Sequence, residues 1–488
     1  GYPMSKKTCD LLVSVDDVMT MDSEDRIIHD ASIAITTDKI VAVGEAATIS
    51  GMYKADKEIN LRGMMALPGL IDTYGHAGHG LIKSLYHPDH GWPTNPVYFH
   101  NSSPRWWYME SMLAAIERIR FGVTTGYSVI GATPARTDNV IYAQKNIEAV
   151  AHVGSKTVVG VGPPDPFVSH VPIPWEGTLW ENGQATRSLF TYEQCLSNTE
   201  QIIHDYHKSN DGRIEVSLHY PYLLSRQAAH PKFPYSYNSK DIPEMIGKSQ
   251  QIREIADKHN VLLHSHAFVG SVDFALKEFG EGVTKDLLKG PTLFAHCNGL
   301  REQEVKILGE CSTGIAVVPF THENLWYGVC PVSDLLQAGA QVTVSTDGSA
   351  PYTSYDLIGE LSRVAWAEWH RTGSQETVLP AKLLRMVTID AARALNIDER
   401  VGSIEVGKQA DITVINFQKP HLTPCYSAPW MLSFYANGND VDTVIVDGEI
   451  LLQGGQHTNV DVDKVIEDAK FESKKALQGV NYQKYIFS

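Results

Sequence analysis

The sequence predicts an α/β protein, a (β/α)8 barrel of the TIM type with a flanking β-sandwich domain formed from both chain termini. Residues 67–400 alternate short β-branched runs with helical stretches about eight times, which is typical of βαβ units that close into a parallel barrel. Residues 4–66 and 401–460 instead carry short apolar runs broken by Asp and Gly turns. Residues 461–488 predict a C-terminal helix and tail.

The individual elements follow in chain order from the apolar runs. The first β part is expected from LLVSVDDV, ASIAIT and IVAVG, and the second from VGSIEVGKQADITVINF and VDTVIVDGEILLQGG. The barrel strands are expected in GVTTGYSVIG, KTVVGVG, RIEVSLHY, NVLLHSHAF, PTLFAHC, TGIAVV and QVTVSTD. Helices are expected between them, for example in TDNVIYAQKNIEAVAHVG, SVDFALKEFG, REQEVKILGEC and PVSDLLQAGA.

Composition excludes several classes of function. The 488 residues are 43% hydrophobic and 20% charged, and 41 Lys plus Arg against 57 Asp plus Glu give a net charge of −16. Such a charge disfavours nucleic acid and anionic membrane as partners. The six cysteines form no C-x-x-C pair, and no run approaches the ~18 apolar residues of a membrane helix. We expect a cytoplasmic protein that acts on a small molecule.

Polar residues that end the predicted barrel strands are candidates for catalysis, because active sites lie at the C-terminal ends of barrel strands. Neutral imidazoles and a carboxylate gathered there suit a divalent metal such as Zn²⁺ and leave a position for water. Any one of these histidines alone is more often a hydrogen-bonded core residue, but five strand ends together favour a metal site. The candidates are Asp72, Tyr74, His76, His79, His219, His264, His266, His296 and Asp347.

The stretch ALPGLIDTYGHAGHG resembles the first-strand motif of the amidohydrolase superfamily, P-G-x-[IV]-[DN]-x-H-x-H, and VGSIEVGKQADITVI resembles its closing motif. The segments LHYPYLLS, HSHAF, FAHC and VSTDGSAPYTSYDLIGEL are similar to the fourth-, fifth-, sixth- and eighth-strand segments of one branch. That branch contains the S-adenosylhomocysteine, guanine and triazine aminohydrolases. The resemblance implies a barrel with a β-sandwich built from both termini.

The same resemblance implies roles for individual residues. His76, His266 and Asp347 would bind one divalent metal, expected to be zinc, with iron or manganese as alternatives. His296 would contact the attacking water or the substrate, and His219 the substrate. Asp347 could also take a proton from the water. Relatives of this kind commonly form homodimers or homotetramers.

Two positions depart from the family pattern. Tyr74 stands where the first histidine of the His-x-His pair belongs. Tyr74 could coordinate as a phenolate, His79 could replace the missing ligand, the site could be weak or empty, or the tyrosine could be an engineered substitution. Val269 stands where the branch commonly has the glutamate of H-x-x-E, which protonates the leaving amine. His322 and Glu323 are candidates for that role, or a solvated loop pair.

The long connection after the first strand carries HPDHGWPTNPVYFHNSSPRWWYMES, which is rich in aromatic residues. Long loops at a barrel mouth are usually functional, so Trp92 and Trp106 are candidates for a wall over a planar substrate, with a subunit contact as the alternative.

The leading hypothesis is a metal-dependent hydrolase that cleaves a C–N bond of a small cyclic or amide-like substrate by metal-activated water. A metal-poor binding or regulatory protein with this fold is one alternative. A metal-dependent lyase or decarboxylase on the same scaffold is another.

Overall fold

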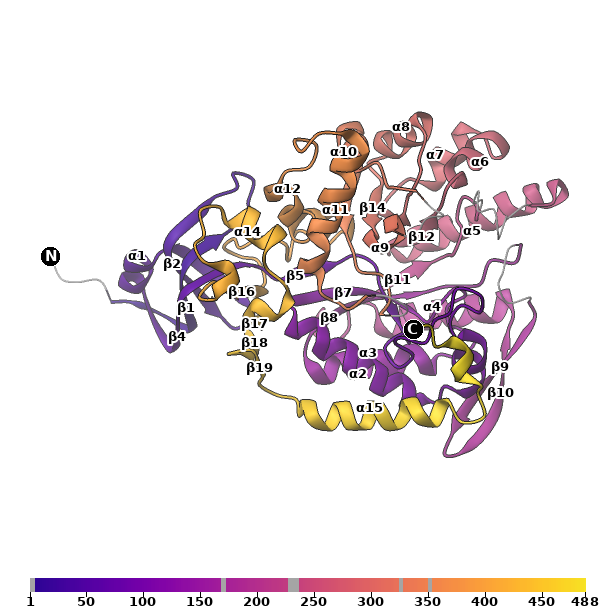
Figure 1. Ribbon diagram of the computed structural model, residues 1–488, viewed down its shortest axis with the longest axis horizontal. Coiled ribbons are helices and arrows are strands. Elements are labelled where there is room, and N and C mark those ends of the chain that lie inside the picture. The colour runs from indigo at the N-terminus through magenta and orange to yellow at the C-terminus, as the bar shows by residue number, and fades with distance from the viewer. Residues whose placement is uncertain (1–4, 168–172, 227–236, 324–327, 350–352) are drawn as a thin grey trace.

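The computed structural model describes residues 5–167, 173–226, 237–323, 328–349 and 353–488. It contains a nearly closed parallel barrel and a second, mostly antiparallel sheet that strands from both ends of the chain build together. Figure 1 shows this sheet at the left, beside the N-terminus, and the barrel with its helices filling the rest of the molecule. The predicted fold class is confirmed.

Eight parallel strands form the barrel, hydrogen-bonded in sequence order. They are almost wholly buried, because the barrel interior covers one face and the helices cover the other. β6 (His76–Ala77) pairs with β7 after β5 has ended. The eight strands are β5 (Leu70–Asp72), β7 (Val123–Ile130), β8 (Lys156–Val161), β11 (Ile214–His219), β12 (Leu263–Ala267), β13 (Thr292–His296), β14 (Gly314–Val317) and β15 (Gln341–Val344).

The barrel closes between β15 and β5 through a third segment. The backbone amide of Val344 donates to the carbonyl of Met386 at 3.3 Å, and the amide of Ile71 donates to the carbonyl of Val387 at 2.9 Å. The chain between two helices therefore satisfies backbone groups of the first and last strands, which would otherwise be buried without partners.

Helices follow most strands and pack on the outside of the barrel. They are α2 (Pro104–Arg120), α3 (Ile141–Val153), α4 (Tyr192–Tyr206), α5 (Ile242–His259), α6 (Ser271–Glu278), α7 (Glu281–Leu287), α8 (Glu302–Glu310), α9 (Pro319–Glu323), α10 (Val332–Ala338), α11 (Leu357–Thr372), α12 (Pro380–Arg385) and α13 (Ile389–Ala394). Ser103 caps α2 by accepting from the amide of Trp106, with Pro104 at the first position, and Gly373 ends α11 at a φ of 71°.

Two further elements lie in the connections on the strand-end side. The first connection contains η1 (Thr94–Asn101), and the connection after β8 contains a hairpin of β9 (Trp175–Glu181) and β10 (Gln184–Phe190). The indole nitrogen of Trp180 in this hairpin donates to the backbone carbonyl of His100. The hairpin is therefore attached to the end of η1.

The second sheet has the order β19-β18-β17-β16-β4-β1-β2-β3. The antiparallel pair of β4 and β16 joins the N-terminal strands to the C-terminal ones. Alternating residues on one face form a core to which both chain ends contribute, among them Val13, Ile33, Ile412 and Ile445. The strands are β1 (Lys7–Met19), β2 (Ile27–Thr36), β3 (Lys39–Glu45), β4 (Tyr53–Pro68), β16 (Ile412–Asn416), β17 (Val441–Val446), β18 (Glu449–Gln453) and β19 (Gln456–His457), with α1 (Ala46–Met52) between β3 and β4.

The chain ends with helix α15 (Val462–Ala476), which runs alongside α2 in Figure 1. The shorter elements of the C-terminal part are η3 (Pro420–Leu422), α14 (Ala428–Phe434), η4 (Gly438–Asp440) and η5 (Tyr482–Tyr485). Within the described ranges, no helix has the length and apolar character needed to span a membrane.

Buried charges connect the barrel to the second sheet. The Lys156 ammonium, at the start of β8, lies 2.8 Å from the Asp411 carboxylate and 2.6 Å from the Asp447 carboxylate. All three side chains are nearly inaccessible to solvent, and burial raises the pKa of Asp411 while Lys156 acts to lower it. Breaking one partner of such a group leaves uncompensated buried charge.

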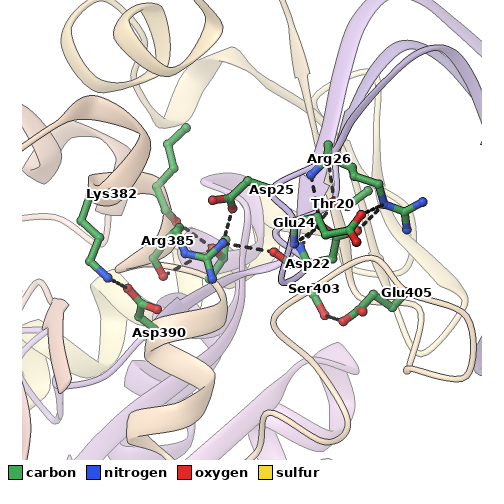
Figure 2. A network of polar contacts seen from close by, with 12 residues as sticks. Thr20, Asp22, Glu24, Asp25, Arg26, Lys382, Arg385, Asp390, Ser403 and Glu405 are labelled. Carbon is green, nitrogen blue, oxygen red and sulfur yellow. Dashed lines mark hydrogen bonds and ion pairs between the residues drawn. The ribbon is translucent and has the colours of Figure 1, made fainter.

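A second polar network connects the same two parts (Figure 2). Arg385 of α12 contacts the Asp25 carboxylate and donates to the backbone carbonyl of Asp22 at 3.3 Å. Both aspartates lie in the turn between β1 and β2.

We expect Lys156→Met to lower the free energy of unfolding by about 3–5 kcal/mol, because it removes the cation that Asp411 and Asp447 share and leaves only Arg213, on the far oxygen of Asp447. Chemical denaturation measures the change. Lys145→Met is the matched control, since Lys145 forms a solvent-exposed pair with Glu148 and such pairs contribute about 0–1 kcal/mol. Equal losses in the two variants would contradict the proposed role of the buried group.

Candidate active site

The structure brings the candidate side chains together at one end of the barrel. They come from the ends of five strands or from the residues that follow them, as the strand-end argument predicts. The ring of Tyr74 lies at the centre, with ring centroids 5.0 Å from His76, 5.3 Å from His264, 5.5 Å from His266 and 5.6 Å from His296. All five side chains are buried.

The hydroxyl of Tyr74 lies between two imidazoles. Its oxygen is 2.7 Å from Nε2 of His76 and 2.8 Å from Nε2 of His266. Nδ1 of His76 donates to the carbonyl of Gly131 at 2.7 Å, and Nδ1 of His266 donates to the carbonyl of Pro221 at 3.0 Å. In neutral rings both Nε2 atoms then carry lone pairs that point at Tyr74. A phenol has one proton, so it can donate to only one of them.

Asp347 lies beside His76, the side chain that also faces the Tyr74 hydroxyl. Its Oδ1 atom lies 3.1 Å from Nε2 of His76, and the amide of Gly348 donates to the same oxygen at 2.7 Å. Burial acts to raise the pKa of Asp347, but the hydrogen bond and charge of His76 outweigh it, and the pKa lies below its usual value. Asp347 and His296 have φ values of 61° and 79°, an unfavourable conformation for non-glycine residues that concentrates at functional sites.

These donors suit a divalent metal. Two imidazole nitrogens, a carboxylate oxygen and a phenol oxygen form a mixed N/O set, and the backbone carbonyls that fix both Nδ1 atoms are typical partners of metal-binding histidines. Tetrahedral zinc ligands lie about 3.3 Å apart, only about half an ångström more than the two N···O separations. Among the described His, Cys, Asp and Glu residues, no three side chains alone form a group that could hold a metal. With the oxygen of Tyr74 the set has four donors.

His79 takes a different position from the one expected of a replacement ligand. Its ring stacks on His76 with centroids 4.5 Å apart and planes 3° from parallel. Trp92 packs edge-on against His79 at 4.8 Å, and Tyr98 stacks against it at 5.8 Å. Because a parallel stack directs the ring nitrogens of both imidazoles sideways, His79 supports His76 instead of facing the same point.

Three histidines beside these donors, His219, His264 and His296, are neutral near pH 7. Burial lowers the pKa of His219 to about 3, with His76 adding to the effect, and burial lowers the pKa of His296 to about 4. Burial likewise holds the pKa of His264 well below its usual value. The ring of His264 lies between Tyr127, 4.1 Å away, and Tyr74. Neither ring nitrogen of His219 has a hydrogen-bond partner among the described residues.

The remaining predicted site residues are placed as follows. Trp92 contacts His79, as described above, and so belongs to the wall around the imidazoles. Trp106 is buried on α2, where its ring packs on Tyr98 at 6.0 Å and Trp107 at 5.4 Å. The side chains of His322 and Glu323, which end α9, lie outside the described residues.

Sequence reasoning missed two contributors to the site. Phe268 follows β12, and its ring stacks on His296 at 4.8 Å. Arg226 lies over the Phe268 ring, with Cζ 3.8 Å from the centroid. The strand-end position of Phe268 is a usable signal, but the strand-end criterion selects only polar side chains. No periodic pattern marks Arg226.

The lowered histidine pKa values predict acid sensitivity. Between about pH 4 and 6.5 the unfolded chain binds more protons at His219 and His296 than the folded chain does. These two histidines therefore do not lower the free energy of unfolding above about pH 6.5. Below that pH the free energy of unfolding falls as the solution becomes more acidic, by up to about 1.4 kcal/mol per pH unit for each imidazole. Urea unfolding of metal-free protein at about pH 7, 6 and 5 measures the slope.

His219→Gln should flatten that slope, whereas His204→Gln, at a residue whose side chain is 85% exposed, should leave it unchanged. A free energy of unfolding that stays constant from pH 7 to about pH 5 would contradict the assignment of neutral buried imidazoles.

The chain is similar to known proteins along most of its length. The family model described as "Amidohydrolase family" matches residues 65–451. The chain is 29% identical over 481 residues to a 5-methylthioadenosine/S-adenosylhomocysteine deaminase of Syntrophobacter fumaroxidans, covering 96% of this chain and 98% of the relative. It is 28% identical over 493 residues to a 5'-deoxyadenosine deaminase of Methanosarcina acetivorans, covering 97% and 99%.

Solved structures share the fold. An adenosine deaminase from Xanthomonas campestris with bound zinc superposes with a TM-score of 0.80 at 19% identity, covering 97% of this chain and all of the other. Atrazine chlorohydrolase from Arthrobacter aurescens with zinc gives a TM-score of 0.75 at 20% identity, covering 95% and 100%. Since the family model spans most of the chain, from the last part of β4 to β18, this protein belongs to the amidohydrolase family.

Proposed function

We propose that the protein is a zinc-dependent deaminase that hydrolyses the bond between a heterocyclic carbon and an exocyclic amine. The observation that carries the proposal is the hydroxyl of Tyr74 between two inward-facing Nε2 atoms, with Asp347 beside one of them. The chain is a metal-dependent hydrolase of carbon–nitrogen bonds other than peptide bonds, and its substrate is a small molecule. Relatives named as adenosine-type deaminases support a 6-aminopurine nucleoside as the substrate.

His76, His266, Asp347 and Tyr74 would hold one divalent ion. When bound, that ion supplies a Lewis acid that lowers the pKa of a water from 15.7 toward about 7. Metal ligation by Tyr74 requires loss of its proton, because a neutral phenol between two imidazoles already donates to one of them. His79 stacks behind His76 and supports that ring.

Asp347 moves the proton in this proposal. Its lowered pKa keeps the carboxylate ionised near neutral pH, and the amide of Gly348 fixes one oxygen, so it can accept a proton from the attacking water. Val269 replaces the glutamate that commonly protonates the leaving amine in this branch. Asp347 therefore also returns the proton to the departing nitrogen, which needs no second carboxylate.

His296 and His219 act as neutral groups. With pKa values of about 4 and 3, they carry no proton to release as imidazolium at neutral pH. Each can instead donate one N–H hydrogen bond to negative charge that develops on the heterocycle during attack. Trp92 supports this arrangement through His79 at the wall of the site.

The proposal includes four further properties of the protein. They are a homodimer or homotetramer, a cytoplasmic location, substrate contacts by Trp106, His322 and Glu323, and domain limits at 4–66, 67–400, 401–460 and 461–488.

An ammonia-release screen with 5'-deoxyadenosine, 5-methylthioadenosine, S-adenosylhomocysteine, guanine and aminotriazines tests the reaction. The proposal expects stoichiometric ammonia from a 6-aminopurine nucleoside. Carbon dioxide release without ammonia would favour a decarboxylase instead. Ammonia from none of the compounds, in protein with a full complement of zinc, would contradict the proposed substrate class.

Asp347→Asn should reduce turnover at least about 1,000-fold while the protein stays folded, because the amide cannot accept the proton. Asp211→Asn is a matched control: Asp211 is exposed and has a φ of 57°, close to the 61° of Asp347, so both changes make the same demand on the backbone. Steady-state ammonia release measures the effect. Turnover of Asp347→Asn within a few-fold of the Asp211→Asn rate would remove the mechanism.

Tyr74→Phe should lower metal affinity about 10–100-fold, because it removes the oxygen between His76 and His266. Copper(II)-loaded protein should show a visible phenolate-to-copper charge-transfer band that this variant loses. Tyr127→Phe is the control. The Tyr127 hydroxyl donates to Ser217, and the ring of His264 separates Tyr127 from Tyr74. A band that persists in Tyr74→Phe, or that never forms in the parent protein, would refute coordination by Tyr74.

A further inference from the structure

The first and last strands of the barrel meet without a ladder of backbone hydrogen bonds. In the described sheet β5 and β15 stand at opposite ends of the strand order, and the segment around Met386 and Val387 bonds to both. Tyr74 follows β5 and Asp347 follows β15 on the two sides of this seam. The separation of these two side chains therefore depends on contacts other than sheet pairing.

A buried carboxylate bridges the two strand ends. Asp72 is the last residue of β5 and is inaccessible to solvent. Its Oδ1 atom accepts from the amide of Tyr74 at 3.3 Å and from the amide of Thr346 at 3.2 Å. Its Oδ2 atom accepts from the hydroxyl of Thr346. One side chain thus holds Tyr74 on one side of the seam and the residue before Asp347 on the other.

The same two segments are also bonded through their backbones. The amide of Asp347 donates to the carbonyl of Tyr74 at 3.0 Å, so Asp72 and this bond together enclose both donors. Asp347 has a φ of 61°, which a non-glycine residue keeps only where its surroundings enforce it. The bonds from Asp72 to Thr346 fix the residue directly before this unfavourable conformation.

We propose that Asp72 is a positioning residue that holds the phenol of Tyr74 and the carboxylate of Asp347 at the separation that one divalent ion requires. The proposal rests on the proposed function for the identity of these two donors. Asp72 is not a metal ligand in this proposal. A carboxylate suits the role because it accepts several hydrogen bonds at once, and groups that orient metal-binding side chains typically contribute about 10–100-fold to metal affinity.

One substitution separates the position that Asp72 imposes from its charge. Burial raises the pKa of Asp72 to about 6, and the positive charge of Arg118 acts against that rise, so Asp72 is ionised at about pH 8. Asp72→Asn removes this charge but keeps an oxygen that accepts from both amides. Its NH2 group can donate to the Thr346 hydroxyl, which then donates to the carbonyl of Asp347, 3.2 Å away. Asp72→Ala removes all three bonds.

Zinc affinity, measured by competition with a chelator at about pH 8, tests the proposal. Asp72→Ala should weaken zinc binding about 10–100-fold, whereas Asp72→Asn should stay within a few-fold of the parent protein. Saturating cobalt(II) reports the arrangement of the donors, so its visible bands should shift in Asp72→Ala and stay unchanged in Asp72→Asn. Thr346→Val removes only the hydroxyl from this contact. It should weaken zinc binding by a smaller factor, and it keeps the test usable where Asp72→Ala fails to fold.

Glu304→Ala is the matched control. Glu304 is also a buried carboxylate that accepts from two backbone amides, those of Arg301 at 2.8 Å and Asp273 at 2.9 Å. Its loss should destabilise the fold but leave zinc affinity and the cobalt bands unchanged. Parent-like zinc affinity and bands in Asp72→Ala would overturn the proposal, as would equal weakening in Glu304→Ala, which indicates a structural role. Equal weakening in Asp72→Asn and Asp72→Ala would overturn it too, because charge would then be the cause.

The metal-binding readouts need no turnover. Zinc affinity that depends on Asp72, in protein that releases no ammonia from any amine tested, would refute the proposed deamination and leave the positioning role standing. Ammonia release by the parent protein, with zinc affinity unchanged in Asp72→Ala, would refute the positioning role alone.

Discussion

The organisation of the site depends on how one phenol proton is shared. Backbone carbonyls fix the Nδ1–H groups of His76 and His266, and this leaves two Nε2 lone pairs directed at the single hydroxyl of Tyr74. While both rings are neutral, as metal binding requires, the phenol proton satisfies only one of the two lone pairs. A buried acceptor without a donor is costly, so the group gains most from a cation that both nitrogens and the oxygen can bind. Replacing the usual histidine by Tyr74 thus changes the charge of the donor set without removing a donor.

The surrounding residues hold Tyr74 and His76 in these positions. The Tyr74 ring belongs to a stack with His264 and Tyr127, and the Tyr355 hydroxyl donates to the backbone carbonyl of His76 at 2.9 Å. The side chain of Arg118 packs closely against the backbone of β7. A Cβ atom on Gly126 would lie 2.6 Å from its guanidinium carbon. Rings and backbone contacts of this kind restrict the side chains more than hydrogen bonds between flexible groups would. They therefore fix the side-chain positions in the site.

The sequence was sufficient for the fold and for the positions of the strand-end residues. Parallel strands bring their C-terminal ends to one side, so His266 and His296 meet at the site whatever the connections do. The direction of His79 could not be predicted, because it depends on packing against Trp92 and Tyr98 from a distant part of the same connection.

Side chains on the connections were harder to predict than those on strands. Trp106 lies only 14 residues beyond Trp92, but it falls inside α2, whose packing buries the ring among Tyr98 and Trp107. Arg226 contacts Phe268 from an irregular connection, where no periodic pattern indicates the direction of a side chain. Such contacts arise from tertiary packing and leave no trace in local sequence.

The flanking sheet also affects the catalytic end of the barrel, through the seam between β15 and β5. The seam is held by the carbonyls of Met386 and Val387, directly after α12, and Tyr74 and Asp347 are joined across it by a backbone hydrogen bond of 3.0 Å. Arg385, the last residue of α12, is bound by the turn that connects β1 to β2 (Figure 2). The N-terminal sheet therefore positions the segment that closes the barrel beside Tyr74 and Asp347. This coupling gives a physical reason for the N-terminal strands to fold against the barrel instead of forming an independent domain.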